Sequence, residues 1–351
     1  MVTIEELLTI AKEKGASDLH ITVGIPPKFR VNGELQDMNC SKLLPSDTHA
    51  VLMPMIPEQL RVVLEDKGEV DFSYSISNLG RYRVNIFKQR GSYAAAIRLV
   101  GTSIPTPEDL GVPESIVELT KKKRGLVLVT GPTGSGKSTT LASLIDVINS
   151  KYNSHIVTLE DPIEYLHQHK KSIVNQREIG LDSYSYANAL RAALREDPDT
   201  ILVGEMRDLD TISIAITAAE TGHLVFSTLH TIGAANTIDR IIDVFPPHQQ
   251  QQIRIQLASV IEAVISQQLI PTSDGKGRVA SFEVMHVNAA IKNLIRESKS
   301  HQITTVIQTN KKLGMQTMDD DIYDLYLRRI INAEQALNYA QDANALERKL
   351  F

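Results

Sequence analysis

The chain has 351 residues, 42% of them hydrophobic, which is enough for two or three compact domains of ordinary size. Its formal net charge of −5 argues against a protein whose main ligand is nucleic acid bound to a broad basic surface. The single cysteine, Cys40, excludes a disulfide framework and a zinc site built from several cysteines, and it fits a reducing compartment.

The first segment, residues 1–15, predicts a short amphipathic helix. Thr3 and Glu6 have the spacing of a capping box, apolar residues recur at helical spacing, and Gly15 suits the helix end. The segment lacks the basic start and apolar stretch of a signal peptide. No apolar run in the chain reaches the ~18 residues that a membrane-spanning helix needs. The sequence therefore predicts a cytoplasmic protein that contacts membranes only through partners.

The following segments predict an antiparallel sheet. Asn32-Gly33 lies between two extended segments and is a strong signal for a hairpin turn. Further along, EVDFSYSI, RYRVNIFKQR and YAAAIRLV alternate or are rich in strand-forming residues, and turn residues separate them. Residues 1–100 are therefore predicted to form a small α+β domain.

A change of pattern marks a domain boundary. Gly101–Pro113 contains three prolines and two glycines, so residues 101–112 are predicted to be a linker. In residues 113–351, GLVLVTG, HIVTLE, TILVGE and HLVFSTLH are nearly continuous apolar runs, typical of strands buried in a parallel sheet. From about Pro246 the pattern is almost entirely helical, with one hairpin predicted around Gly275–Gly277. A helical C-terminal region is expected from about residue 288.

The segment GPTGSGKST matches the phosphate-binding pattern G-x-x-x-x-G-K-[ST]. It follows a predicted strand and precedes a predicted helix, the order in which backbone N–H groups converge on phosphate oxygens. Lys137 is expected to reach the β- and γ-phosphates of ATP, and the Ser138 hydroxyl to bind Mg²⁺. The predicted nucleotide-binding residues are Gly131, Pro132, Thr133, Gly134, Ser135, Gly136, Lys137, Ser138 and Thr139.

Hydrolysis also needs an acid that holds the metal or orients water. Glu205 ends the predicted buried strand TILVGE, the position of a Walker-B acid. A buried acid at the end of a strand is costly unless it has a partner. Glu160, Asp161 and Glu164 follow another apolar strand in VTLEDPIEY. On spacing alone, a solvated turn and a functional site explain these three acids equally well.

Histidines and arginines lie near the same predicted strand ends. His223 begins and His230 ends the run HLVFSTLH, and the sequence does not separate a nucleotide sensor from a structural residue. Arg191 and Arg195 in LRAALREDPD are predicted to lie one turn apart on the same helix face. They form either a solvated basic edge or, near a nucleotide, a pair that neutralises phosphate charge.

Together these segments resemble the secretion ATPase superfamily, the motors of type II secretion, type IV pili and type IV secretion. The matching order is GPTGSGKST, TLEDPIE (the Asp box), LVGEMRD (Walker B) and STLHTIGAANTIDRIIDVFPPHQQQQIR (the His box). IKNLIRE and HQITTVIQTNKKLGMQTMDD are similar to the PilT branch of retraction motors, with Lys292 where that branch has arginine. In the His box, Ile232-Gly233 replace the more usual polar pair. Extension motors carry a tetracysteine metal site, so the single cysteine favours retraction.

The resemblance implies an α/β fold in which a PAS-like α+β domain precedes a RecA-like P-loop ATPase domain. It further implies Mg²⁺-dependent ATP hydrolysis in a homohexamer, with nucleotide bound between the two domains. Glu205 matches the Walker-B acid and is also a predicted Mg²⁺ ligand, while Glu164, the last acid of the Asp box, is the candidate catalytic base. The remaining candidate catalytic residues are Lys137, His230, the N-terminal-domain arginines Arg83 and Arg98, and the ATPase-domain arginines Arg191 and Arg195.

The function that this resemblance implies is retraction of a type IV pilus, and hence twitching motility. The partners would be identical subunits and an inner-membrane platform protein that holds the cytoplasmic ring at the membrane, and nucleic acid is not expected as the main ligand. One alternative is another traffic ATPase of the superfamily, serving secretion or DNA uptake. A second is a nucleotide-regulated scaffolding ring without significant turnover.

Overall fold

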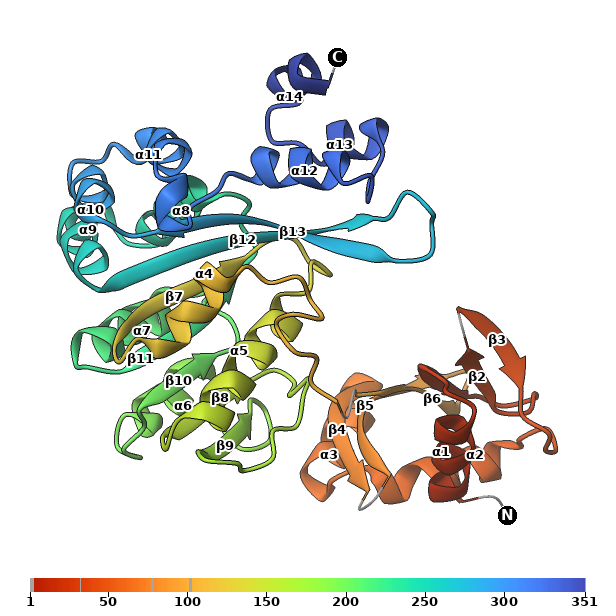
Figure 1. Ribbon diagram of the computed structural model, residues 1–351. Coiled ribbons are helices and arrows are strands. Elements are labelled where there is room, and N and C mark those ends of the chain that lie inside the picture. Colours follow the sequence, from red (N-terminus) through yellow and green to blue (C-terminus); the bar gives the residue numbers. More distant parts are fainter. Residues whose placement is uncertain (1–2, 32, 77–78, 101–102, 351) are drawn as a thin grey trace. The chain divides into compact units, whose positions relative to one another are not determined.

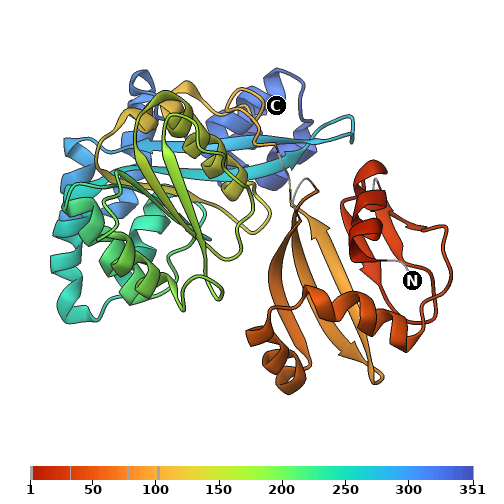
Figure 2. The same cartoon turned by 90° about the horizontal axis from the view of Figure 1, so that it is seen from below.

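A computed structural model describes residues 3–31, 33–76, 79–100 and 103–350. The chain forms two compact units, drawn in Figures 1 and 2. The N-terminal unit holds residues 1–103 and 162–166, and the C-terminal unit holds residues 104–161 and 167–351. Asn32 of the predicted hairpin and residues 101–102 of the predicted linker lie outside the described residues.

Within the described residues, the N-terminal unit is an antiparallel sheet with three α-helices. The order across the sheet is β3-β2-β1-β6-β5-β4. The strands are β1 Asp18–Ile21, β2 Lys28–Val31, β3 Glu34–Asp37, β4 Glu69–Ile76, β5 Gly80–Gln89 and β6 Ser92–Leu99. The helices are α1 Ile4–Glu13, α2 Pro45–Leu52 and α3 Glu58–Lys67, with a 3-10 helix at Met53–Met55. This confirms the α+β composition predicted for this part of the chain.

The first helix, α1, begins where the sequence predicted. The Thr3 hydroxyl accepts a hydrogen bond from the Glu6 N–H at 3.2 Å, and the Glu6 carboxylate accepts one from the Thr3 N–H at 2.8 Å. These bonds satisfy two N–H groups at the start of the helix that have no intrahelical partner. Leu7 and Leu8 on the inner face of α1 are buried in the core of the unit.

The predicted hairpin at Asn32-Gly33 is confirmed by the pairing of its strands. β2 and β3 run antiparallel, with Lys28 opposite Asp37 and Val31 opposite Glu34. Gly33 has a φ of +88°, a conformation that glycine adopts more easily than other residues. β3 ends one edge of the sheet, and all four of its residues are exposed.

Within the described residues, the C-terminal unit is built on a sheet of order β13-β12-β7-β11-β10-β8-β9. All pairs are parallel except β12 with β13. The strands are β7 Gly125–Thr130, β8 His155–Glu160, β9 Ile173–Glu178, β10 Thr200–Val203, β11 Leu224–Leu229, β12 Ile261–Pro271 and β13 Arg278–His286. The α-helices are α4 Glu114–Val117, α5 Lys137–Lys151, α6 Tyr186–Ala193, α7 Leu209–Glu220, α8 Ala234–Asp243, α9 Pro247–Val260, α10 Ala289–Arg296, α11 Ile303–Thr309, α12 Met318–Leu327, α13 Ala333–Tyr339 and α14 Ala343–Leu350. Short 3-10 helices cover Glu118–Lys121, Ser300–Gln302 and Lys311–Leu313.

The parallel sheet has a hydrophobic core on each face. Successive side chains of a strand point to opposite faces. Leu126 and Leu128 of β7 accordingly belong to one core with residues of α6 to α11, whereas Val127 and Val129 belong to the other with residues of α4 and α5. Every residue of β7, β10 and β11 is buried. The predicted α/β class with a parallel sheet is therefore confirmed.

One sequence prediction is wrong: the chain after Pro246 is not almost entirely helical. The long strands β12 and β13 follow α9, and β12 lies between β13, the edge strand, and β7. β12 contains the buried polar residues Ser266, Gln267 and Gln268, which broke the apolar run that identified the other strands. The predicted hairpin around Gly275–Gly277 does connect β12 to β13.

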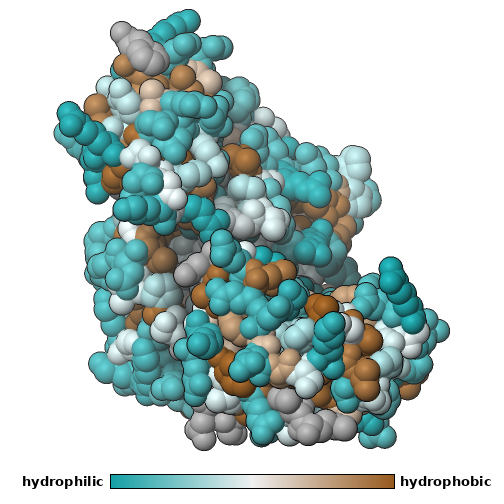
Figure 3. Space-filling view, turned by 90° about the vertical axis from the view of Figure 1, so that its right-hand side faces the viewer, coloured by the Kyte–Doolittle hydropathy of each residue, from teal (hydrophilic) through white to brown (hydrophobic). Residues whose placement is uncertain are grey.

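The face of the molecule in Figure 3 is mainly hydrophilic, with smaller hydrophobic patches between polar areas. None of the helices in the part of the chain that the structure describes is both long and apolar enough to cross a membrane.

Candidate active site

The predicted phosphate-binding loop connects β7 to α5, so the unpaired N–H groups at the start of α5 lie at the loop. Gly131 has a φ of +143° and Gly136 a φ of +87°. A Cβ on Gly131 would lie 2.2 Å from the carbonyl oxygen of Gln267, and a Cβ on Gly136 would lie 2.9 Å from Nε2 of the same residue. Both positions therefore require glycine, and Gln267 of β12 contacts the loop closely at both ends.

The side chains of the loop are suited to an anion. Lys137 is 8% exposed, and its Nζ donates to the carbonyl oxygens of Gly131 at 2.9 Å and Pro132 at 3.0 Å. Ser135 is buried, and its hydroxyl has no hydrogen-bond partner among the described residues. A buried hydroxyl without a partner costs free energy, and a phosphate oxygen would accept its hydrogen bond. Of the other predicted binding residues, Thr133 and Gly134 lie on the same loop, and Ser138 and Thr139 lie in the first turn of α5.

Polar residues end the neighbouring parallel strands at the same edge of the sheet as this loop. β11 lies beside β7, and β10 lies beside β11. Glu205, two residues after β10, accepts a hydrogen bond from Arg207, and its Oε1 lies 3.1 Å from Nε2 of His230, directly after β11. The Glu205 side chain is 15% exposed. The fold therefore brings together the predicted Walker-B acid and the histidine of the predicted His box.

Tyr186 is a residue of this site that the sequence analysis missed. A Cβ on Gly204 would lie only 2.9 Å from the Tyr186 hydroxyl, so glycine before Glu205 lets the phenol approach the backbone there. Burial raises the pKa of Tyr186, and the charges of Asp161, Glu205 and Glu160 raise it further. The phenol therefore stays protonated and can donate a hydrogen bond beside the acids. A single tyrosine at the start of a helix gave no signal of this role in the sequence.

Arg191 and Arg195, the candidate arginines of the C-terminal unit, do not lie on one helix face as predicted. α6 ends at Ala193, so Arg195 lies in the turn after the helix and does not share a helix face with Arg191. The reason is a tight turn: the Arg195 N–H donates to the Ala192 carbonyl oxygen, three residues back, at 2.9 Å, and Asp197 has a φ of +55°. Arg191 is exposed, with Nη2 3.6 Å from Oδ2 of Asp210.

The structure also places a second histidine and a further acid named in the sequence analysis. His223 lies at the amino end of β11, whereas His230 lies at the carboxyl end of the same strand. The Nδ1 atom of His223 is 2.9 Å from the Ala218 carbonyl oxygen, and this contact gives His223 a structural role. Glu164 is exposed and belongs to the segment 162–166, which groups with the N-terminal unit.

The predicted arginines of the N-terminal unit form a pair. Arg83 of β5 lies directly opposite Arg98 of β6. The two side chains are 51% and 69% exposed; Arg83 Nε is 3.9 Å from Oδ1 of Asp71, and Arg98 Nε is 2.9 Å from Oδ1 of Asp18. Like charges directly opposite each other on a sheet are destabilising. An anion bound to both arginines would relieve this repulsion.

Hydrogen bonds to β12 and β13 hold the loop after His230. The Gly233 N–H donates to Ser266 Oγ at 3.0 Å, and the Ala234 N–H donates to Oε1 of the buried Glu283 at 2.7 Å. Gln341 Nε2 donates to the other oxygen of Glu283 at 3.3 Å. Gly233 has a φ of +86°, which accounts for glycine at this position of the His box.

Glu283 predicts a pH dependence of stability. Burial raises the pKa of its carboxyl, and the surrounding N–H groups do not cancel this rise. Because the pKa is higher in the folded than in the unfolded chain, the free energy of unfolding falls as pH increases through the folded-state pKa. Glu283→Gln removes the ionisable group but keeps the oxygen that accepts from Ala234. We expect the thermal unfolding midpoint to fall less for this variant than for wild type between about pH 4 and about pH 8. Equal slopes would contradict this assignment.

Known proteins resemble the chain along most of its length. Residues 107–337 match the family described as Type II/IV secretion system protein. The Type IV pilus retractation ATPase PilT of Pseudomonas aeruginosa is 48% identical over 338 residues, which are 96% of this chain and 98% of that protein. A twitching motility protein of Neisseria gonorrhoeae is 47% identical, over 91% of this chain and 86% of its own. A crystal structure of the pilus retraction motor PilT with bound ADP matches with a TM-score of 0.93 and 50% identity, over 99% of this chain and 100% of that chain. These likenesses confirm the RecA-like ATPase fold that the sequence predicted.

Proposed function

The chain belongs to the family described as Type II/IV secretion system protein, and we propose that it is an ATPase motor that powers retraction of a type IV pilus. The observation that best supports this function is the contact between Glu205 and His230 at the sheet edge that also bears the phosphate-binding loop. An acid there can hold the metal or orient water beside a bound γ-phosphate, as in other P-loop ATPases. The retractation ATPase described above is similar over nearly the whole chain.

In the proposed mechanism, the loop binds the phosphates of ATP. Lys137 exchanges the carbonyl oxygens of Gly131 and Pro132 for oxygens of the β- and γ-phosphates, and the Ser135 hydroxyl donates to a phosphate oxygen. The exchange is favourable because a hydrogen bond between two charged groups is stronger than one to a neutral carbonyl. The N–H groups at the start of α5 add further donors.

The residues also fit a Mg²⁺ ion, which would neutralise phosphate charge during the reaction. Mg²⁺ keeps several waters and takes one or two ligands from the protein, rather than a cage of side chains. Ser138, exposed in the first turn of α5, and Glu205 are the proposed ligands. Within the described residues, no group of three or more His, Cys, Asp and Glu could hold a metal ion by itself, in keeping with a site that the nucleotide completes.

The remaining proposed site residues act on the attacking water and on the charge that develops on the transferred phosphoryl group. Glu205 and Glu164 are the proposed acids, one to orient or deprotonate the attacking water and one to serve the metal. His230 holds the Glu205 carboxylate in position. Four arginines neutralise charge on the transferred phosphoryl group in the transition state: Arg83, Arg98, Arg191 and Arg195.

Glutamine at either acid should separate binding from hydrolysis. Glu205→Gln and Glu164→Gln keep the side-chain shape but remove the charge, so we expect ATP binding to persist while phosphate release falls by roughly 10²–10⁴-fold. A fluorescent ATP analogue measures binding, and a coupled phosphate assay measures turnover. Glu334→Gln, at an exposed position in α13, is the matched control and should retain full activity. Normal turnover in both test variants would exclude both acids from catalysis.

We further propose that the motor is a homohexamer and that arginines of the N-terminal unit complete its nucleotide sites. The ring would bind an inner-membrane platform protein from the cytoplasm and contact the membrane only through it. The pair Arg83 and Arg98 supports this proposal, since two arginines, each more than half exposed, lie directly opposite each other on one strand pair.

A deletion strain tests the proposed role in the cell. Loss of twitching together with surplus surface pili is expected, because pilins would still be added to fibres that cannot be retracted. Bald cells would indicate an extension motor. Co-purification with a secretion-channel protein in place of a pilus platform would favour another traffic ATPase, and absent phosphate release would favour a scaffolding ring.

A further inference from the structure

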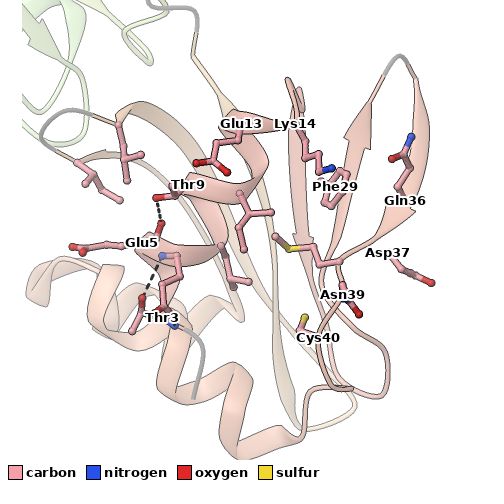
Figure 4. A pocket seen from close by; sticks show the side chains of 16 residues that line it. Thr3, Glu5, Thr9, Glu13, Lys14, Phe29, Gln36, Asp37, Asn39 and Cys40 are labelled. Carbon is pink, nitrogen blue, oxygen red and sulfur yellow. Dashed lines mark hydrogen bonds between the residues drawn. The ribbon is translucent and has the colours of Figure 1, made fainter.

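The N-terminal unit contains an open groove that the proposed reaction does not use. Its volume is about 1110 Å³, and residues of α1 line one side of it. The end of β3 and the loop after it, residues 36–40, line the other side. Figure 4 shows Glu5 and Glu13 on the helix side, and Asp37 and Cys40 on the opposite side.

The groove combines an apolar floor with an acidic rim. Ile10, on α1, is 40% exposed, and the partly buried Ile76 and Leu79 continue the apolar surface. An exposed isoleucine beside further apolar side chains favours binding of an apolar group. The carboxylates of Glu5 and Glu13 are exposed along this surface.

The balance of charge around the groove is negative. Four acidic residues line the groove, but only one basic residue of its lining is described, Lys14. Two of the acids are already engaged, because Glu6 caps α1 and Asp37 lies 2.8 Å from Lys28. The exposed charges of Glu5 and Glu13 would repel a phospholipid surface or a nucleic acid and attract a cation.

We propose that this groove binds a basic amphipathic segment of a partner protein. Apolar side chains of that segment contact Ile10 and its neighbours, and lysines or arginines on its other side lie near Glu5 and Glu13. The volume exceeds the usual range of about 300–1000 Å³ for small-molecule pockets, which favours a peptide segment as the occupant. None of the described residues that line the groove belongs to the phosphate-binding loop.

The only cysteine of the chain provides a direct probe. Cys40 lines the groove and is partly exposed. Burial raises the pKa of its thiol, so it reacts slowly with a maleimide near neutral pH and the rate is easily followed. With the full-length protein, a synthetic peptide of alternating leucine and lysine should slow labelling of Cys40 in a saturable way. A peptide with glutamate in place of lysine should leave the rate unchanged.

Two variants with the same change of charge test the acidic rim. Glu13→Lys, in the last turn of α1, should weaken binding of the fluorescent leucine–lysine peptide about tenfold, because it replaces an attraction by a repulsion. Asp66→Lys, exposed near the end of α3 in the same unit, should leave the affinity within about twofold of wild type. A lysine is favourable near the C-terminus of a helix, so both variants should fold, which circular dichroism verifies. Ile10→Ser should weaken binding through the apolar floor.

Four results would overturn the proposal. Unchanged affinity in Glu13→Lys, or an equal loss in Asp66→Lys, would show that the peptide does not recognise this rim. Protection of Cys40 by the glutamate peptide would show that charge plays no part. Protection that rises with protein concentration when no peptide is present would show that a second copy of this chain covers the groove.

Discussion

Replacing Lys137 with alanine is expected to lower the rate of ATP hydrolysis by about 10³-fold. The amine is buried in the phosphate-binding loop, where it donates to the neutral carbonyl oxygens of Gly131 and Pro132 at 2.9 and 3.0 Å. In the proposed mechanism it transfers to the phosphates and stabilises the charge that develops as the γ-phosphoryl group leaves. Phosphate release from purified protein over a range of Mg²⁺ and ATP concentrations measures this loss.

A second lysine on the same helix provides the control for this prediction. Lys151 is exposed in the last turn of α5, far along the helix from the loop, so Lys151→Ala should retain wild-type turnover. Thermal unfolding of both variants separates a catalytic loss from a loss of fold. Turnover close to that of wild type in folded Lys137→Ala would remove the basis for assigning ATP hydrolysis to this loop.

The second large effect is expected at the arginine pair of the N-terminal unit. If Arg83 and Arg98 stabilise the γ-phosphate, alanine at either position should lower turnover by about 10³-fold or more, as loss of an arginine finger does elsewhere. If they are ordinary exposed residues, the same changes should alter the free energy of unfolding by only a few tenths of a kcal/mol and leave turnover unchanged. Their positions opposite each other, both more than half exposed, favour the catalytic outcome.

Mixed rings test the same arginines in the assembly. In a ring whose subunits act together, an Arg83→Ala subunit should depress the activity of wild-type subunits by more than its share of the mixture. A subunit with Lys67→Ala, at an exposed position of α3, should change the activity of the mixture by no more than its share of the subunits. Activity that falls in strict proportion for both variants, or full activity from a strictly monomeric preparation, would contradict the proposed ring.

Local patterns predicted those parts of the fold whose signals lie within a few residues. The capping box at Thr3 and the phosphate-binding loop after β7 depend on contacts between near neighbours in the chain. The buried strands β7, β10 and β11 were predictable because every position in them is buried and therefore apolar or small.

β12 was missed for the opposite reason. Its polar residues are buried yet satisfied by partners distant in the sequence. Gln267 accepts a hydrogen bond from Thr140 at 2.8 Å, and Ser266 accepts one from Gly233 at 3.0 Å. Because those partners become neighbours only in the folded sheet, no local pattern could mark these residues as part of a strand.

The sequence by itself determined the α/β class, the phosphate-binding loop and the acids and histidine that follow the strands, because strand ends and loop glycines have local residue requirements. Only the tertiary structure decided which of these residues meet. It placed His230 3.1 Å from Glu205, Tyr186 beside Gly204 and Gln267 against the phosphate-binding loop, and it removed Arg195 from the face of α6. The physical reason is that parallel strands bring together residues separated by long crossover connections, and sequence spacing does not specify the order of strands across a sheet.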